Sequence, residues 1–136
     1  MERVPVLNLG DILLVSIQID LSDEIALRLQ DDLSERIVAT GARGVIIDLT
    51  ALDIVDSFVG RTLSTIAGIS RVLDAETVVV GMRPAVAITL VELGLSLSGV
   101  PTALNVELGL KRLRSALPRS VSLPLVEPEP EPVAGP

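Results

Sequence analysis

Gly44-Val45-Ile46-Ile47-Asp48-Leu49 decides the fold class, because so continuous an apolar run is typical of a parallel strand buried on both faces. A second run of this kind covers Thr77 to Val80 and is closed by Gly81. Between them a helix is predicted to start near Asp56, since apolar residues recur there at helical spacing. Its inward stripe is predicted at Val59, Leu63, Ile66, either Ile69 or Ser70, and Leu73. This order predicts two parallel strands joined by a crossover helix.

The segments before this unit extend the pattern. Two short apolar segments, Val4 to Leu9 and Ile12 to Ile17, flank the turn residues Asn8 to Asp11, which predicts a hairpin. Ser22 is a predicted N-cap, and Gly41 is a predicted end for the helix that follows. The inward stripe of that helix is predicted at Ile25, Leu29, Leu33 and Ile37.

The segments after it predict two more helices and one strand. Pro84 suits the first turn of a helix and Gly94 suits its C-cap. A short strand is predicted from Thr102 to Leu104, and Asn105 is a good N-cap for a last helix. The inward residues of that helix are predicted to be Val106, Leu110, Leu113 and Leu117. The fold class is therefore α/β, with a mixed, mostly parallel sheet packed with four main helices.

Composition changes after Leu117, and this change predicts the domain organisation. Six of the nine prolines lie in residues 118–136, where Glu127, Glu129 and Glu131 alternate with proline. Such a segment favours extended polyproline conformations and cannot build a core. We expect one domain over residues 1–117 and a flexible Pro/Glu-rich tail over residues 118–136. A docking peptide is the alternative interpretation of the tail.

The composition also excludes several classes of function. The chain has neither cysteine nor histidine, which removes thiolate and imidazole chemistry and the usual zinc or haem ligands. Phe58 is the single aromatic residue, so a base-stacking surface cannot be built, and a net charge of −7 disfavours nucleic acid. The longest uncharged stretch, Leu93 to Val106, is shorter than the roughly 20 residues of a membrane span. We expect a cytoplasmic protein without cofactor, metal, membrane or nucleic-acid partner.

Three carboxylates, Asp48, Asp53 and Asp56, follow the central strand, where ligands gather in parallel sheets. They could bind Mg²⁺, or Asp48 could accept a phosphoryl group as in a receiver domain. A receiver also needs an acidic pair after its first strand and a lysine at the end of its last strand. The chain offers one acid at residues 18–20, and its single lysine, Lys111, falls in the last helix. Turn residues and a helix cap account for the three carboxylates without a metal.

Ser57 has a more specific setting than the other hydroxyl residues. With Asp56 as N-cap, it occupies the first turn of the second helix, where free backbone N–H groups and the helix dipole favour a phosphate. The neighbouring carboxylates oppose that gain. On local chemistry alone, an ordinary helix-start residue is the better explanation of Ser57.

A resemblance to a known family changes this balance. Four segments together resemble the STAS domain family, and within it the single-domain core proteins of the bacterial stressosome. The likeness runs from about Val4 to Leu117. The segments are Asp11 to Gln18, Gly44 to Thr50, Val55 to Phe58 and Gly81 to Gly94.

The resemblance implies a non-enzymatic scaffold of stress signalling, an anti-sigma-factor antagonist. Such a protein holds a serine kinase of the RsbT type until that kinase phosphorylates the helix-start serine, which Ser57 matches. The implied partner-binding residues are Asp53, Asp56, Phe58 and Arg61. Thr89 falls where related proteins carry a second phosphoacceptor, although a plain helix-surface threonine is the simpler interpretation. The resemblance also implies homo- and hetero-oligomers with RsbR-type paralogues, and an RsbX-type phosphatase that resets the switch.

Another branch of the family gives the alternative function. Sporulation-type anti-anti-sigma factors bind an anti-sigma kinase directly and carry Asp-Ser-Ser-Gly at this turn. Here Phe58 and Val59 stand in place of the second serine and the glycine, which favours the stressosome type. The proline-acidic tail departs from what the family leads us to expect.

Overall fold

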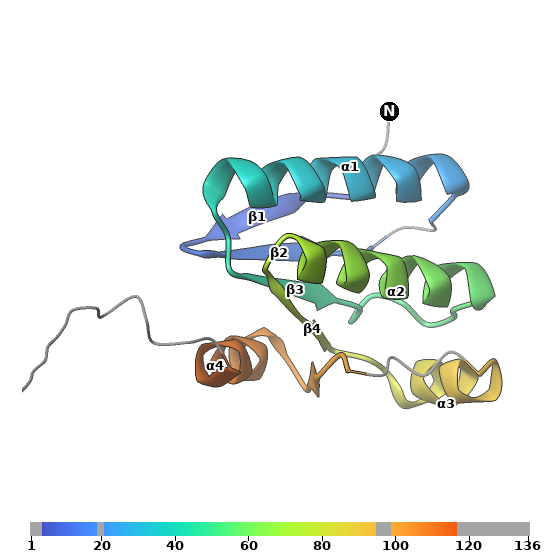
Figure 1. Cartoon of the computed structure of the whole chain (residues 1–136). Helices are drawn as coiled ribbons and strands as arrows, with labels where there is room; N and C mark the ends of the chain where they lie inside the picture. The colour runs from blue at the N-terminus through green and yellow to red at the C-terminus, as the bar shows by residue number, and fades with distance from the viewer. Residues whose placement is uncertain (1–3, 19–20, 95–98, 117–136) are drawn as a thin grey trace, which may run out of the picture.

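The computed structural model describes residues 4–18, 21–94 and 99–116, which form one α/β unit (Figure 1). Its sheet has five strands in the order β1-β2-β3-β4-β5. The first pair is antiparallel and the other three pairs are parallel. The strands are β1 (Val6–Leu9), β2 (Ile12–Ser16), β3 (Gly44–Asp48), β4 (Glu76–Val80) and β5 (Thr102–Ala103). The predicted mixed, mostly parallel sheet is confirmed.

Four helices cover this sheet, as predicted. They are α1 (Asp23–Thr40), α2 (Ser57–Val72), α3 (Pro84–Glu92) and α4 (Val106–Ala116). Figure 1 shows α1 and α2 side by side on one face, α4 on the opposite face, and α3 beyond the end of β4. The carboxyl end of the sheet, the start of α2 and α3 therefore lie at the same end of the molecule.

The sheet is buried on both faces, and β3 shows how its sequence achieves this. Val45 and Ile47 belong to the large core under α1 and α2, whereas Ile46 belongs to the smaller core under α4. Successive side chains of a strand point to opposite faces, so both core layers need apolar residues from the same run. The continuous apolar sequence is thus a direct consequence of helices on both faces.

Local capping also follows the sequence. The Ser22 hydroxyl accepts a hydrogen bond from the backbone N–H of Ile25 at 3.2 Å, and Gly41 ends α1 with φ of +68°. Asn105 caps α4 by accepting from the N–H of Leu108 at 2.9 Å. Pro84 is the first residue of α3, and Gly94 follows its end with φ of +72°. The predicted helix starts and the end of α1 at Gly41 are confirmed, whereas the C-cap of α3 is Leu93, one residue before the predicted Gly94.

Several details differ from the predictions or refine them. In α2, Ser70 is buried and Ile69 is only half-buried, which decides the alternative left open by the spacing. Ser70 can face the core because its hydroxyl donates to the backbone oxygen of Ile66 at 2.9 Å. In α4, Leu113 is fully buried and Val106 and Leu110 pack partly against the same core. Leu117 and the predicted tail lie outside the described residues, so the boundary at residue 117 stays a prediction.

Candidate functional site

The candidate site lies where β3 leaves the sheet and the chain turns into α2. Ser57 is the first residue of α2 and is half-buried. Asp56 is the N-cap, and its carboxylate accepts a hydrogen bond from the N–H of Val59 at 2.9 Å. Within the part of the chain that the structure describes, no hydrogen bond involves the Ser57 hydroxyl. This hydroxyl is therefore structurally uncommitted, unlike the Asp56 carboxylate beside it.

The connection from β3 begins with a hydrogen-bonded turn. Asp48 Oδ1 accepts from the backbone N–H of Thr50 at 2.9 Å and from the Thr50 hydroxyl at 2.5 Å. The N–H of Leu49 continues the sheet by donating to the carbonyl of Val80. Asp48 is thus used to shape the turn, as expected of an acidic turn residue.

Gly81, directly after β4, lies against this turn. It has φ of +72°, and a Cβ atom there would clash with Thr50 Oγ1 and lie 2.9 Å from Asp48 Oδ1. A side chain at this position would force Thr50 and Asp48 apart. Gly81 was predicted to end a strand, and its small size also allows the turn before α2 to close.

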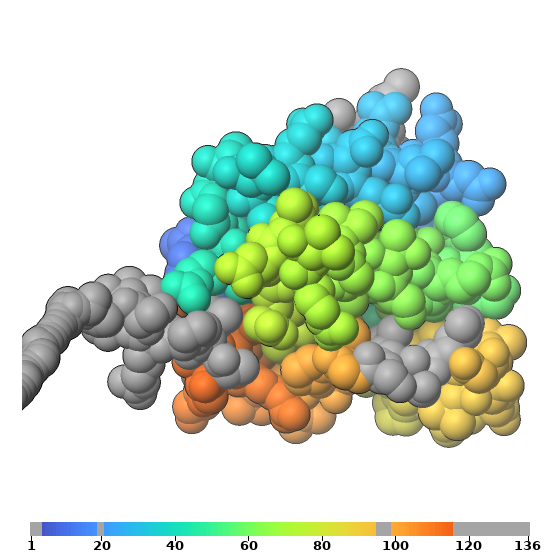
Figure 2. Space-filling model, in the orientation of Figure 1, coloured from blue at the N-terminus to red at the C-terminus, as the bar shows by residue number. Residues whose placement is uncertain are grey.

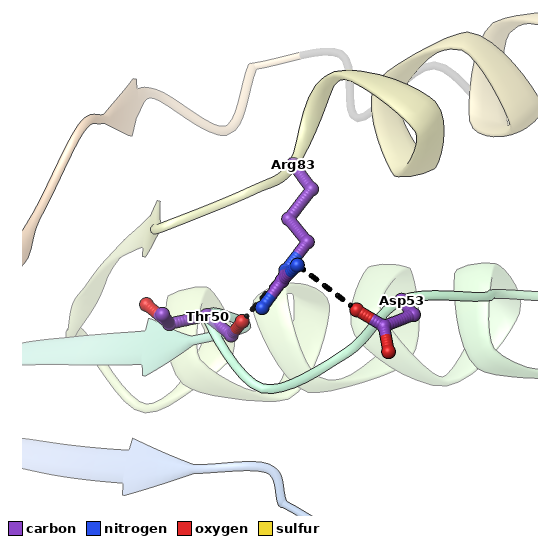
Figure 3. Close-up of polar contacts among 3 residues, drawn as sticks. All are labelled: Thr50, Asp53 and Arg83. Carbon is purple, nitrogen blue, oxygen red and sulfur yellow. Dashed lines mark hydrogen bonds and ion pairs between the residues drawn. The ribbon is translucent and has the colours of Figure 1, made fainter.

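Arg83 holds the same connection from the other side (Figure 3). Its Nε donates to the backbone oxygen of Thr50 at 3.0 Å, and its Nη1 lies 3.0 Å from Asp53 Oδ1. Both side chains are more than half exposed, so the ion pair itself is weak. Two contacts from one guanidinium nevertheless define where residues 50–53 lie relative to the start of α3. Arg83 lies within the family segment Gly81 to Gly94, but its contacts could not be predicted from that resemblance.

The predicted partner-binding residues all lie within four residues of Ser57 along the chain and differ in exposure. Asp53, Asp56 and Arg61 are exposed, whereas Phe58 is half-buried. Phe58 is not among the residues that pack against either hydrophobic core, which leaves part of its ring available at the surface. Ile54 is 84 % exposed in the same connection. The sequence analysis did not single it out, because one apolar residue in a loop carries no pattern.

Thr89, the possible second phosphoacceptor, lies on α3 rather than in this connection. Its hydroxyl donates to the backbone oxygen of Ala85 at 2.9 Å, as threonines on helix surfaces commonly do. Figure 2 shows the first turns of α2 above α3 at one end of the molecule. The Thr89 hydroxyl is thus committed to its own helix, whereas the Ser57 hydroxyl is not.

The carboxylates after β3 do not form a cation cage. Within residues 4–18, 21–94 and 99–116, no group of three or more acidic side chains is placed to hold a metal ion. Asp48 is bonded to Thr50 and Asp53 is paired with Arg83. Asp56 caps α2. Each of the three carboxylates therefore has a definite partner within the protein, which explains its place without a metal ion.

A five-stranded mixed sheet with a serine at the start of the helix that follows β3 defines the class of domain. Residues 3–108 match the model of the STAS domain family, and the chain belongs to this family. No helix among the described residues is long and apolar enough to cross a membrane.

Comparison with individual proteins points to one branch of the family. The chain is similar to Moorella thermoacetica RsbS carrying a serine-to-glutamate substitution, with 38 % identity and a TM-score of 0.73. That match covers 82 % of this chain and 95 % of RsbS. A chain in a structure described as the molecular architecture of the stressosome is 40 % identical, with a TM-score of 0.74, over 82 % of this chain and 96 % of that one.

The chain is also similar to one curated relative. The RsbT co-antagonist protein RsbRA of Bacillus subtilis is 31 % identical over 88 residues, which make up 65 % of this chain. The chain spans about a third of the length of that relative, 32 %. The predicted resemblance to stressosome STAS proteins is therefore confirmed.

Proposed function

We propose that this protein is an RsbS-like scaffold of a stressosome, which holds an RsbT-type serine kinase and releases it when Ser57 is phosphorylated. The observation that carries the proposal is the setting of Ser57: the first residue of α2, half-buried, with an uncommitted hydroxyl. The similarity to RsbS and to a stressosome chain supports the choice of pathway.

The residues around Ser57 provide a surface on which a kinase can dock. We call this the switch surface and define it as Asp53, Ile54, Asp56, Ser57, Phe58 and Arg61. It combines exposed charge with two apolar side chains, Ile54 and Phe58, that can be buried by a partner. Such a mixture suits an interface that must form and dissociate, since charged and apolar contacts both contribute.

Phosphorylation changes the charge of this surface and leaves the fold in place. The kinase transfers the γ-phosphoryl group of ATP to the Ser57 oxygen, ADP leaves, and the hydroxyl proton passes to the kinase's base. The product gains about −1.5 to −2 charges. At about 7 Å from an acidic partner group, with an effective dielectric near 40, the repulsion is on the order of 2 kcal/mol. That loss weakens the complex roughly thirty-fold.

The domain itself can tolerate the phosphate. Ser57 lies in the first turn of α2, where the helix dipole favours negative charge. Arg61 is exposed one turn further on, at the i,i+4 position, which is close enough for a charge-assisted contact with a phosphate on Ser57. Asp56 opposes both effects by repulsion. Release therefore results from the changed surface and requires no unfolding of α2.

The remaining parts of the proposal concern assembly and resetting. Similarity to RsbRA and to a chain of a stressosome structure supports co-assembly with RsbR-type paralogues into a larger oligomer. An RsbX-type phosphatase would remove the phosphate and restore kinase binding. The protein acts in this scheme as substrate and scaffold, with no catalytic role of its own. Thr89 stays a possible second phosphoacceptor, and the proposal assigns kinase release to Ser57, whose hydroxyl, unlike that of Thr89, is not bonded within its own helix.

The direct test is to map the phosphate. The full chain is incubated with an RsbT-type kinase and Mg²⁺-ATP, and the modified residue is identified by peptide mass spectrometry. We expect a single phosphate on Ser57, no incorporation into Ser57→Ala, and normal incorporation into Thr89→Ala. Modification of Ser57→Ala at the wild-type rate would refute the assignment.

A further inference from the structure

A second surface lies between the last strand and the last helix. A shallow groove of about 450 Å³ runs along the edge of the sheet next to α4. Its lining residues are Thr102, Ala103, Leu104, Leu108, Lys111, Arg112 and Ser115. The members from α4 are spaced three and four residues apart, so they form one stripe of that helix. The stripe lies beside the one that packs on the sheet through Gly109 and Leu113.

The groove is both apolar and basic. Leu104 is 81 % exposed and Leu108 is 39 % exposed. Lys111 and Arg112 are exposed, and neither has an ion-pair partner among the described residues. By contrast, Arg114 on the same helix forms an ion pair, with its Nη1 lying 3.9 Å from Asp11 Oδ1. Two unpaired cations beside exposed leucines favour an extended acidic ligand with some apolar content.

One wall of the groove is an unpaired sheet edge. β5 is the edge strand, and its inner side is used by β4: the N–H of Val79 donates to the oxygen of Pro101, and the N–H of Gly81 donates to the oxygen of Ala103. Because backbone groups alternate sides along a strand, Thr102 directs its N–H and carbonyl groups outward. The outer edge of β5 can therefore pair with the backbone of one further extended segment.

The chain carries a segment with matching chemistry. Glu127-Pro128-Glu129-Pro130-Glu131-Pro132, which we call the acidic segment, alternates a carboxylate with a proline. In an extended conformation its three glutamates share one face, and their N–H groups share one edge. The opposite edge is proline, which has no N–H to donate. Such a segment can pair with β5 and at the same time prevents any further strand from adding.

The connection to the groove is long enough. α4 runs back along the sheet from Leu108 to Ser115, about 10 Å of helix at 1.5 Å per residue. Residues 117–126 can span up to about 33 Å, and the acidic segment covers about 20 Å as an extended strand. The chain can therefore leave the end of α4, turn, and lay the acidic segment along the groove beside β5.

We propose that the acidic segment docks in this groove of its own chain, with its glutamates paired to Lys111 and Arg112. This docking covers the open edge of β5 and the exposed Leu104 with a segment that cannot template another copy. The tail thus acts as a built-in cover for the sheet edge. The proposal is independent of Ser57 and of the kinase.

Paramagnetic NMR on the full chain tests this directly, because the sequence has no cysteine and one engineered thiol gives one label. A nitroxide on Ala134→Cys should reduce the intensities of the amide signals of Leu104, Leu108 and Lys111, with α1 unaffected. The loss should disappear in Glu127→Gln/Glu129→Gln/Glu131→Gln and in Lys111→Gln/Arg112→Gln, and shrink as salt rises. The matched control Asp31→Asn/Asp74→Asn/Glu92→Gln removes three carboxylates elsewhere and should keep the loss.

Mixing isotopes separates the tail of the same chain from that of a second copy. Isotope-labelled chains without nitroxide are mixed with unlabelled chains that carry it, and the groove signals should keep full intensity. Losses in this mixture would overturn docking within one chain and assign the groove to a neighbouring copy. Uniform or absent losses in the singly labelled chain would overturn the proposal altogether.

Discussion

Arg83 and Asp53 are joined by an ion pair of 3.0 Å that links the start of α3 to the connection before Ser57. The same guanidinium also donates a hydrogen bond from its Nε to the backbone oxygen of Thr50. These contacts connect two loops that are 30 residues apart in sequence and lie at the carboxyl end of the sheet (Figure 3). The position of the switch surface therefore depends on a residue outside it.

Removing this guanidinium should loosen the connection while leaving the domain folded. For Arg83→Ala we expect a loss of about 1 kcal/mol in the free energy of unfolding, since the ion pair is exposed and the backbone contact is a single hydrogen bond. Amide hydrogen exchange should accelerate at residues 50–56. Arg114→Ala, which breaks the longer and equally exposed pair with Asp11, is the matched control and should not change exchange there. Unchanged exchange in Arg83→Ala would show that the connection is held by other contacts.

Gly81 should be far more sensitive than another glycine with the same backbone conformation. Gly81→Ala adds left-handed strain of about 1–2 kcal/mol and also displaces Thr50 from Asp48, an overpacking cost of about 1–3 kcal/mol. Gly10 has φ of +68° and open space around it, so Gly10→Ala should show the strain alone. Denaturant unfolding of both variants measures the difference. Equal losses would mean that the turn yields without cost.

Two helical glycines should respond with opposite signs. A Cβ on Gly109 would lie 2.7 Å from Val80 Cγ1 in the core under α4, whereas one on Gly68 meets nothing within 4 Å. Alanine gains about 1 kcal/mol in helix propensity at either site. We expect Gly68→Ala to raise the free energy of unfolding by about 0.5–1 kcal/mol, and Gly109→Ala to lower it through overpacking of about 1–3 kcal/mol. Stabilisation by both would show that α4 can move away from the sheet.

The backbone architecture could be predicted from the sequence because each local signal agreed with its neighbours. The apolar run in β3, the caps Ser22 and Asn105, and Pro84 all indicate the same element order that the structure shows. The choice between Ile69 and Ser70 could not be made from spacing. It depends on the Ser70 hydroxyl reaching the oxygen of Ile66, which makes burial of a polar residue inexpensive.

Only the part of the site that is local in sequence could be predicted. Ser57 and Asp56 are adjacent in sequence, so their relation follows from the start of a helix. Arg83 and Gly81 meet Thr50 only after β3 and β4 have paired, and no periodicity or motif reports such a contact. One signal in the sequence could have pointed to them. Gly81 and Arg83 come directly after a predicted parallel strand, where functional residues gather.

The central claim is that the charge on Ser57 controls kinase binding, and affinity measures it most directly. An RsbT-type kinase is titrated by calorimetry against wild type, Ser57→Ala and Ser57→Asp at two salt concentrations. We expect Ser57→Ala to bind like wild type, because the hydroxyl has no structural partner among the described residues. Ser57→Asp should bind at least about five-fold more weakly, a loss of about 1 kcal/mol that shrinks as salt rises. Equal affinity of all three proteins at both salt concentrations would contradict the account and leave Ser57 without a role in kinase release.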